Sequence, residues 1–223
     1  MSVKAARSER AAETREAIMA AAERLFAEHG LAAVSNRQIS EAAGQGNNTA
    51  VGYHFGAKAE LVRAIVRKHA ESTERLRQRM LDEIGDSDDV RDWVGCLVRP
   101  ASEHLAVLGT PSWYARFAAQ VMTDPVLRVI IEDEALTREP MQQTLEGLGR
   151  CLPELPAHVR AERAEMMRHL IVHTHAERER VLAAGTTPLQ PSWEHTATAL
   201  TDALVGLLLA PVSPRDNPKE TPR

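Results

Sequence analysis

The chain has 223 residues, of which 43 % are hydrophobic, so it can bury a sizeable core and is not a disordered protein. Its formal net charge of −4 argues weakly against nucleic-acid binding by the surface as a whole. Two cysteines exclude a disulfide framework, and the most apolar run, residues 203–212, is about half of the roughly 20 residues that span a bilayer. The first residues are polar and charged, unlike a secretory signal, so we expect a cytoplasmic protein with no membrane partner.

Charge is distributed unevenly along the chain. Residues 1–68 contain ten Lys or Arg and seven Glu, a net charge of +3, so the remainder must carry −7. A basic first part on an acidic body is typical of proteins in which one end approaches phosphates. The surplus is modest, and chance could also produce it.

Apolar residues recur at intervals of three and four along nearly every segment, which predicts an all-helical fold. The first helix ends at His29, where Gly30 supplies a left-handed residue. A second, short helix has a complete start signal. Ser35 is its N-cap, Gln38 completes a capping box, and Val34 and Ile39 form a hydrophobic staple.

The second helix should stop at Gly44, and a turn follows at residues 45–46. A brief third helix should then begin with Asn47 or Asn48 as its cap and run to about Tyr53. Six longer segments give a total of about nine helices: residues 57–84, 90–105, 111–122, 125–151 with a bend or break at Pro140, 156–184 and 192–210. We expect a DNA-binding domain at 1–60, a ligand-binding and dimerisation domain at 61–211, and a disordered tail at 212–223.

Two short helices joined by a Gly-containing turn and packed on a longer helix form a helix-turn-helix. The second helix of such a pair lies in a major groove about 12 Å wide. Asn47, Asn48 and Thr49 would stand at its start, where Asn can make a bidentate contact to adenine and a Thr methyl can touch thymine. The alternative for the first Asn is that it only caps the helix.

Residues 14–64 read TREAIMAAAERLFAEHGLAAVSNRQISEAAGQGNNTAVGYHFGAKAELVRA, and they resemble the DNA-binding domain of the TetR family. Several pieces match in order and spacing: Ala21 and Ala22 with Leu25, Phe26 and Gly30, then Val34 and Ser35 before Ile39, then Ala43 and Gly44, then Tyr53, His54 and Phe55, and finally Lys58 with Leu61. The turn after Gly44 is one residue longer than the usual pattern, and Gly52 stands where many members carry a tyrosine.

The resemblance implies that the start of the second helix binds phosphates, that the third helix contacts bases, and that the aromatic-His pair and the following lysine hold the DNA backbone. The residues at these positions are Ser35, Arg37, Gln38, Asn47, Asn48, Thr49, Tyr53, His54 and Lys58. Lys58 opens a helix, where a cation opposes the macrodipole unless an anion is near. The alternative for it is a solvated lysine offset by Glu60. Arg7 and Arg10 could reach a minor groove or belong to a frayed arm.

The resemblance also implies a helical body that encloses a small-molecule pocket and dimerises through its last two long helices. We predict a homodimer interface on their apolar stripes, formed by Met166, Leu170, Leu200, Leu204, Leu207 and Leu208. The alternative is that these stripes are one more internal core face. Two DNA-binding heads about 34 Å apart would read two half-sites one turn apart.

Aromatic and soft residues gather in the body of an otherwise aromatic-poor chain, and they suit a largely apolar effector with a few polar handles. The candidates are His104, Trp113, Tyr114, Phe117, Met122, His169 and His173, although each alone could be ordinary core. His169 and His173 have a spacing that could chelate a metal, but no carboxylate or thiolate cluster completes a site, so we expect neither metal nor cofactor.

These observations together predict a transcription regulator that binds double-stranded operator DNA, most simply a repressor that a small molecule releases. An enzyme is disfavoured because the sequence contains no Gly-rich phosphate loop, nucleophile elbow or metal-hydrolase motif. An activator of the same fold and a helical adaptor that binds protein remain as alternatives. Only DNA binding should weaken steeply with added salt.

Overall fold

The computed structural model describes residues 3–47, 49–152, 154–189 and 191–213, and over these ranges every regular element is a helix, which confirms the predicted fold class. The helices are α1 (Val3–His29), α2 (Asn36–Ala42), α3 (Ala50–Phe55), α4 (Lys58–Ile84), α5 (Val90–Leu108), α6 (Tyr114–Thr123), α7 (Arg128–Leu136), α8 (Glu139–Cys151), α9 (Ala157–Ala183) and α10 (Trp193–Leu209). None of these helices is both long enough and apolar enough to cross a membrane.

The ends of the helices follow the local signals in the sequence. Gly30 closes α1 with a φ of 83°, and its N–H donates to the Phe26 carbonyl at 2.9 Å. The segment expected over 125–151 is divided into α7 and α8, so the described ranges hold one helix more than expected. Pro140 lies in the first turn of α8. A backbone N–H in the first turn has no acceptor within the helix, so proline, which lacks this N–H, loses no hydrogen bond there.

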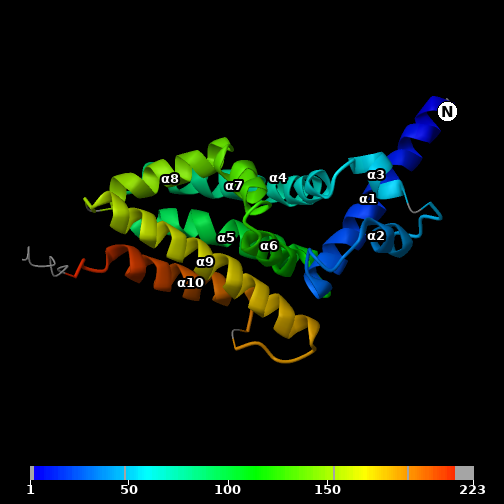
Figure 1. The fold of residues 1–223 in the computed structure, drawn as a ribbon. Helices are drawn as coiled ribbons and strands as arrows, with labels where there is room; N and C mark the ends of the chain where they lie inside the picture. Colours follow the sequence, from blue (N-terminus) through cyan, green and yellow to red (C-terminus); the bar gives the residue numbers. More distant parts are fainter. Residues whose placement is uncertain (1–2, 48, 153, 190, 214–223) are drawn as a thin grey trace, which may run out of the picture.

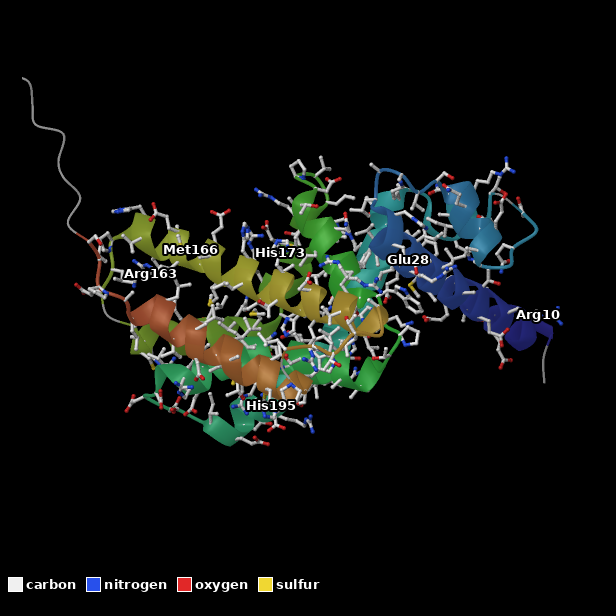
Figure 2. All side chains as sticks on the ribbon, turned by 90° about the horizontal axis from the view of Figure 1, so that it is seen from below. Arg10, Glu28, Arg163, Met166, His173 and His195 are labelled. Atoms are coloured by element: carbon white, nitrogen blue, oxygen red, sulfur yellow. The ribbon has the colours of Figure 1, made fainter. Side chains whose placement is uncertain are left out.

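Helix α1 begins at Val3, well before the apolar stripe that predicted it. Arg10 therefore lies on a helix, and the expectation of a frayed arm is wrong for the described residues. Figure 2 shows Arg10 at the end of α1 that is remote from the body.

Helices α1, α2 and α3 form a head at one end of the molecule, and α4 runs from this head back along the body (Figure 1). One core joins the head to the first part of α4, and its members without solvent exposure include Ile18, Phe26, Ile39, Val51, Leu61 and Ile65. The same core continues into Phe117 of α6 and Ile130 of α7. Head and body therefore share one apolar core at their junction.

The second core fills the body, where α5 packs against α4, α8 and α10. Leu200, Leu204 and Leu208 of α10 are buried within this core. The prediction that these three leucines form the dimer interface is therefore wrong, because they cover α5 of their own subunit. Leu207 is half-buried and packs at the edge of the same core.

Helices α9 and α10 lie side by side (Figure 1) and are tied together at one end by Arg163. The buried guanidinium of Arg163 donates to the carbonyls of Leu208 at 2.7 Å and Ala210 at 2.6 Å, which are orphan acceptors at the end of α10. Both cysteines are free.

Candidate nucleic-acid interface and effector region

The start of α2 is the best-defined part of the candidate interface. Ser35 Oγ accepts from the Gln38 N–H at 3.3 Å, and Gln38 Oε1 accepts from the Ser35 N–H at 2.8 Å, so the predicted capping box is confirmed. Ser35 and Gln38 are exposed, and Arg37 between them points into solvent while its Nε contacts Glu41 Oε1 at 2.8 Å. All three side chains are open to a phosphate backbone.

The beginning of α3 differs from the prediction. The N-cap position is Thr49, and Asn47 instead forms a turn in which its Oδ1 accepts from the Thr49 N–H at 3.0 Å and from the Thr49 hydroxyl at 2.7 Å. The expectation that Asn47 caps the helix is therefore wrong, because the side chain bonds two residues ahead before the helix starts. Asn48 lies outside the described residues.

Helix α3 separates a buried face from an exposed one. Val51 and Phe55 belong to the core of the head, whereas Thr49 and Tyr53 face solvent, and the Tyr53 side chain is 80 % exposed. The Tyr53 ring meets the half-buried His54 ring edge-on with centroids 5.0 Å apart. A helix with a packed inner face and a free polar and aromatic outer face can enter a groove without unfolding the head.

Arg15 of α1 supports the end of α3, a role that no sequence pattern indicated. Its guanidinium lies 4.2 Å from the Phe55 ring centroid, and its Nη1 donates to the His54 carbonyl. Both contacts are made across 39 residues of sequence or more, so no local pattern reveals them.

Lys58, at the first position of α4, is bound inside the head. Its Nζ donates to the carbonyl of Leu31 at 2.9 Å and to that of Val34 at 2.7 Å. These acceptors lie in the loop after α1, so the lysine joins that loop to α4. The alternative of a solvated lysine is therefore wrong. The predicted contact of Lys58 to DNA would require its ammonium to bind a phosphate in addition to these two carbonyls.

The seven predicted effector residues do not come together in one site. Four lie where the body meets the head (Figure 2 labels Glu28 there). Trp113 Nε1 donates to Glu28 Oε1 at 3.2 Å, and Phe117 is fully buried with its ring stacked on Phe26 at 6.2 Å. Tyr114 stacks on His69 with ring centroids 3.7 Å apart, and His69 in turn contacts His104.

His69 and His104 form the centre of a buried polar chain. His69 Nδ1 lies 2.7 Å from His104 Nε2, and His69 Nε2 lies 2.8 Å from Glu23 Oε2 of α1. Burial, the neighbouring His69 and the charge of Arg75 lower the pKa of His104 to about 4, so its ring is neutral near pH 7. Burial and the nearby Glu23 raise the pKa of the Tyr114 phenol above its usual range. This row of hydrogen-bonded side chains thus joins α1, α4 and α5 in a largely buried site.

The other three effector candidates, Met122, His169 and His173, line a separate hollow of about 280 Å³ beside α9. The rings of His169 and His173 have centroids 5.9 Å apart. No group of three or more potential metal ligands is found in the part of the chain that the structure describes.

A buried carboxylate that no sequence pattern indicated holds α6 in place. Glu179 of α9 is only 1 % exposed and accepts from four donors at the start of α6. They are Ser112 Oγ at 2.8 Å, the Ala115 N–H at 3.2 Å, the Arg116 N–H at 2.9 Å and Arg116 Nε at 3.2 Å. A charged acceptor at a helix N-terminus is favourable for both the free N–H groups and the helix dipole.

Residues 18–65 match the family of bacterial regulatory proteins described as the tetR family, and residues 95–206 match the tetracyclin repressor-like C-terminal domain. The HTH-type transcriptional regulator TtgR of Pseudomonas putida is 37 % identical over 89 residues, and the probable HTH-type transcriptional regulator ArpR of Pseudomonas putida matches equally well. These alignments span 40 % of this chain and 40 % of each relative.

Two of the solved structures that align with this chain have TM-scores just below 0.5. The multidrug binding protein EbrR complexed with imidazole is 19 % identical with a TM-score of 0.49, over 89 % of this chain and 97 % of that one. PfmR from Thermus thermophilus is 15 % identical with a TM-score of 0.49, over 86 % and 94 % of the two chains. The family is shown by the two family matches, at residues 18–65 and 95–206. The second match alone spans half of the chain. The chain belongs to the tetR family of bacterial regulatory proteins.

Proposed function

We propose that this chain is a transcription repressor that binds double-stranded operator DNA as a homodimer and leaves it when a small molecule binds the body. Residues 1–60 act as the DNA-binding domain, and residues 61–211 bind the ligand and the second subunit. The two family matches, at residues 18–65 and 95–206, support this division. The names of TtgR and ArpR, each of which describes a transcriptional regulator, support the role.

The observation that carries the proposal is the outer face of α3. Tyr53 exposes 80 % of its side chain although it is an aromatic residue, while its neighbours Val51 and Phe55 fill the core. An exposed tyrosine on a packed helix presents both an apolar ring and a hydroxyl to a partner that covers this face. Thr49 on the same face and the polar start of α2 give that partner a hydrogen-bonding surface suited to phosphates and base edges.

The release mechanism that we propose is a shift in population between two arrangements of the heads. Helix α4 belongs to both head and body, and α6 packs against both α1 of the head and α9 of the body. A ligand that prefers one arrangement of these helices weakens operator binding by its difference in affinity for the two states.

For the homodimer we propose α9 as the contact surface. An open groove of about 910 Å³ runs along it, lined by Met166, Leu170 and His173 of α9 and by Leu189 of the following loop. Met166 is 51 % and Leu170 41 % exposed, and Figure 2 shows Met166 and His173 along the same helix. A second copy would cover these apolar side chains and present two α3 helices for half-sites one turn apart.

The test starts from DNA fragments that the purified protein selects from a random pool. Binding of such a fragment is measured by fluorescence anisotropy at several salt concentrations, and log K should fall linearly with log salt. Tyr53→Ala should weaken binding by about tenfold or more, ~1.4 kcal/mol. The control is Val126→Ala, a residue 77 % exposed in the loop between α6 and α7, which should bind like the unmodified protein. Salt-independent binding, or full binding by Tyr53→Ala, would overturn the proposal.

A further inference from the structure

A hollow of about 580 Å³ lies between α4 and α5, next to the junction with the head. Leu76 of α4 and Val107 and Leu108 of α5 give it an apolar lining, and the Val107 side chain is 82 % exposed. A volume of this size suits a small organic ligand. Leu108 is 37 % exposed, so both side chains can contact an occupant of the hollow.

Basic residues surround this apolar lining: Lys68, Arg75 and Arg79 of α4 all border the hollow. Lys68 pairs with Glu16, and Arg79 lies 3.7 Å from Glu103. Arg75 donates to Ser72 Oγ at 3.0 Å and has no carboxylate within 4.0 Å among the residues that the structure describes. The rim therefore carries one positive charge that its carboxylate neighbours leave uncompensated.

The inner end of the hollow is formed by His69 and His104, the buried chain described above. His69 contacts Glu23 of α1 and stacks on Tyr114 of α6, so an occupant would touch side chains that hold the head and the body together. The neutral imidazole ring of His104 adds no charge at this end. The anion-attracting groups are therefore the basic residues at the rim.

We propose that this hollow binds an amphipathic carboxylate, with its hydrocarbon chain on Leu76, Val107 and Leu108 and its anionic head at Arg75. An arginine can hold a carboxylate through two parallel hydrogen bonds, and the apolar chain gains from leaving water. The assignment rests on the proposed function only in naming this occupant as the effector. Binding itself requires no DNA.

Isothermal titration of the full chain, without DNA, with sodium decanoate below its micellar concentration tests the site. Decanol and decyltrimethylammonium carry the same hydrocarbon chain with no charge and with positive charge. Decanoate should bind at least tenfold more tightly than either.

Arg75→Gln and Val107→Asp should each weaken decanoate binding at least tenfold. Both residues are exposed, so neither change should disturb folding. Arg160→Gln, an exposed arginine on α9, is the matched control and should bind decanoate normally.

The assignment is overturned if decanoate does not bind, if decanol or the ammonium compound binds equally well, or if both hollow variants bind like the control. Because the titration contains no DNA, failure here leaves the proposed repressor function standing. A protein that binds decanoate but no operator would contradict the proposed function alone.

Discussion

Gly147 of α8 lies directly against the indole ring of Trp93, which is buried in the second core. A Cβ added at Gly147 would stand 2.3 Å from Trp93 Cε3, far inside contact distance, whereas one added at Gly149 would meet nothing within 4 Å. The first position is glycine because the ring occupies its side-chain space. At residue 149 no neighbouring side chain requires glycine.

We therefore expect Gly147→Ala to lower the free energy of unfolding by about 2 kcal/mol or more, since the ring or the helix must move. Gly149→Ala, two residues along the same helix, should raise stability by up to about 1 kcal/mol through helix propensity. Urea unfolding followed by circular dichroism measures both. Equal effects of the two substitutions would show that the Trp93 contact does not limit the packing of α8.

His175 of α9 is a buried neutral base whose Nε2 lies 2.7 Å from Ser102 Oγ. Burial lowers its pKa from 6.5 to about 4, so the unfolded state binds more protons than the native state between these values. The contribution of this group to stability is therefore complete above about pH 6.5 and is lost as the pH falls toward 4.

The expected loss is roughly 3 kcal/mol over that window. Urea unfolding at pH 7 and pH 5 should show a smaller difference in His175→Asn than in the unmodified protein. His158→Asn, an exposed histidine on the same helix, should keep the full difference. A pH dependence unchanged in His175→Asn would place its source elsewhere.

Among the helices, α6 depends on a group that it does not contain. Glu179 of α9 satisfies two backbone N–H groups at the start of α6 and pairs with Arg116 in a site almost closed to solvent. Four donors converge on this one carboxylate, so its removal leaves buried donors and a largely buried guanidinium without their acceptor.

Glu179→Ala should lower the free energy of unfolding by about 3–5 kcal/mol and increase hydrogen exchange at the amides that begin α6. Glu177→Ala is the control, because that carboxylate is exposed and pairs with the exposed Arg180, an interaction worth less than about 1 kcal/mol. If both variants lose the same stability, the carboxylate of Glu179 does not hold α6.

Elements with local signals could be predicted from the sequence, whereas pairings between distant elements could not. The capping box of Ser35 and Gln38 joins residues three apart, so the pattern itself specifies the geometry. The carbonyl partners of Lys58 lie 24 and 27 residues away, and nothing near the lysine indicates them. The unfavourable position of this cation at a helix start indicated a nearby acceptor but did not identify it.

The leucine stripe of α10 shows the same limit. A helix face that covers a neighbour in its own subunit and one that covers a second subunit have the same spacing of apolar residues. Leu200, Leu204 and Leu208 therefore gave the same signal as a dimer face, and only the position of α5 against them decides between the two. Likewise, aromatic residues of α6 that suited a pocket, such as Phe117, pack instead where the head meets the body.

In the proposed dimer, contact between the α9 helices of the two subunits fixes the positions of the two heads. The exposed apolar residues of that helix include Leu170, which lines the open groove and is 41 % exposed in the single chain. In a two-fold contact each such residue meets its own counterpart or a near neighbour, so one substitution acts twice. A charge placed there would be buried without a partner at two points of the interface.

We expect Leu170→Arg to convert the dimer to a folded monomer, as measured by sedimentation velocity, with an unchanged circular dichroism spectrum. Val129→Arg on α7 is the control, since its 47 % exposure is close to that of Leu170 but it lies away from the groove. The monomer should also lose operator binding by about a hundredfold or more, because a single α3 helix reaches only one half-site and the linked second contact is lost. A dimer that persists in Leu170→Arg would assign the subunit contact to another surface. A monomer that still binds the operator at full affinity would contradict the requirement for two heads.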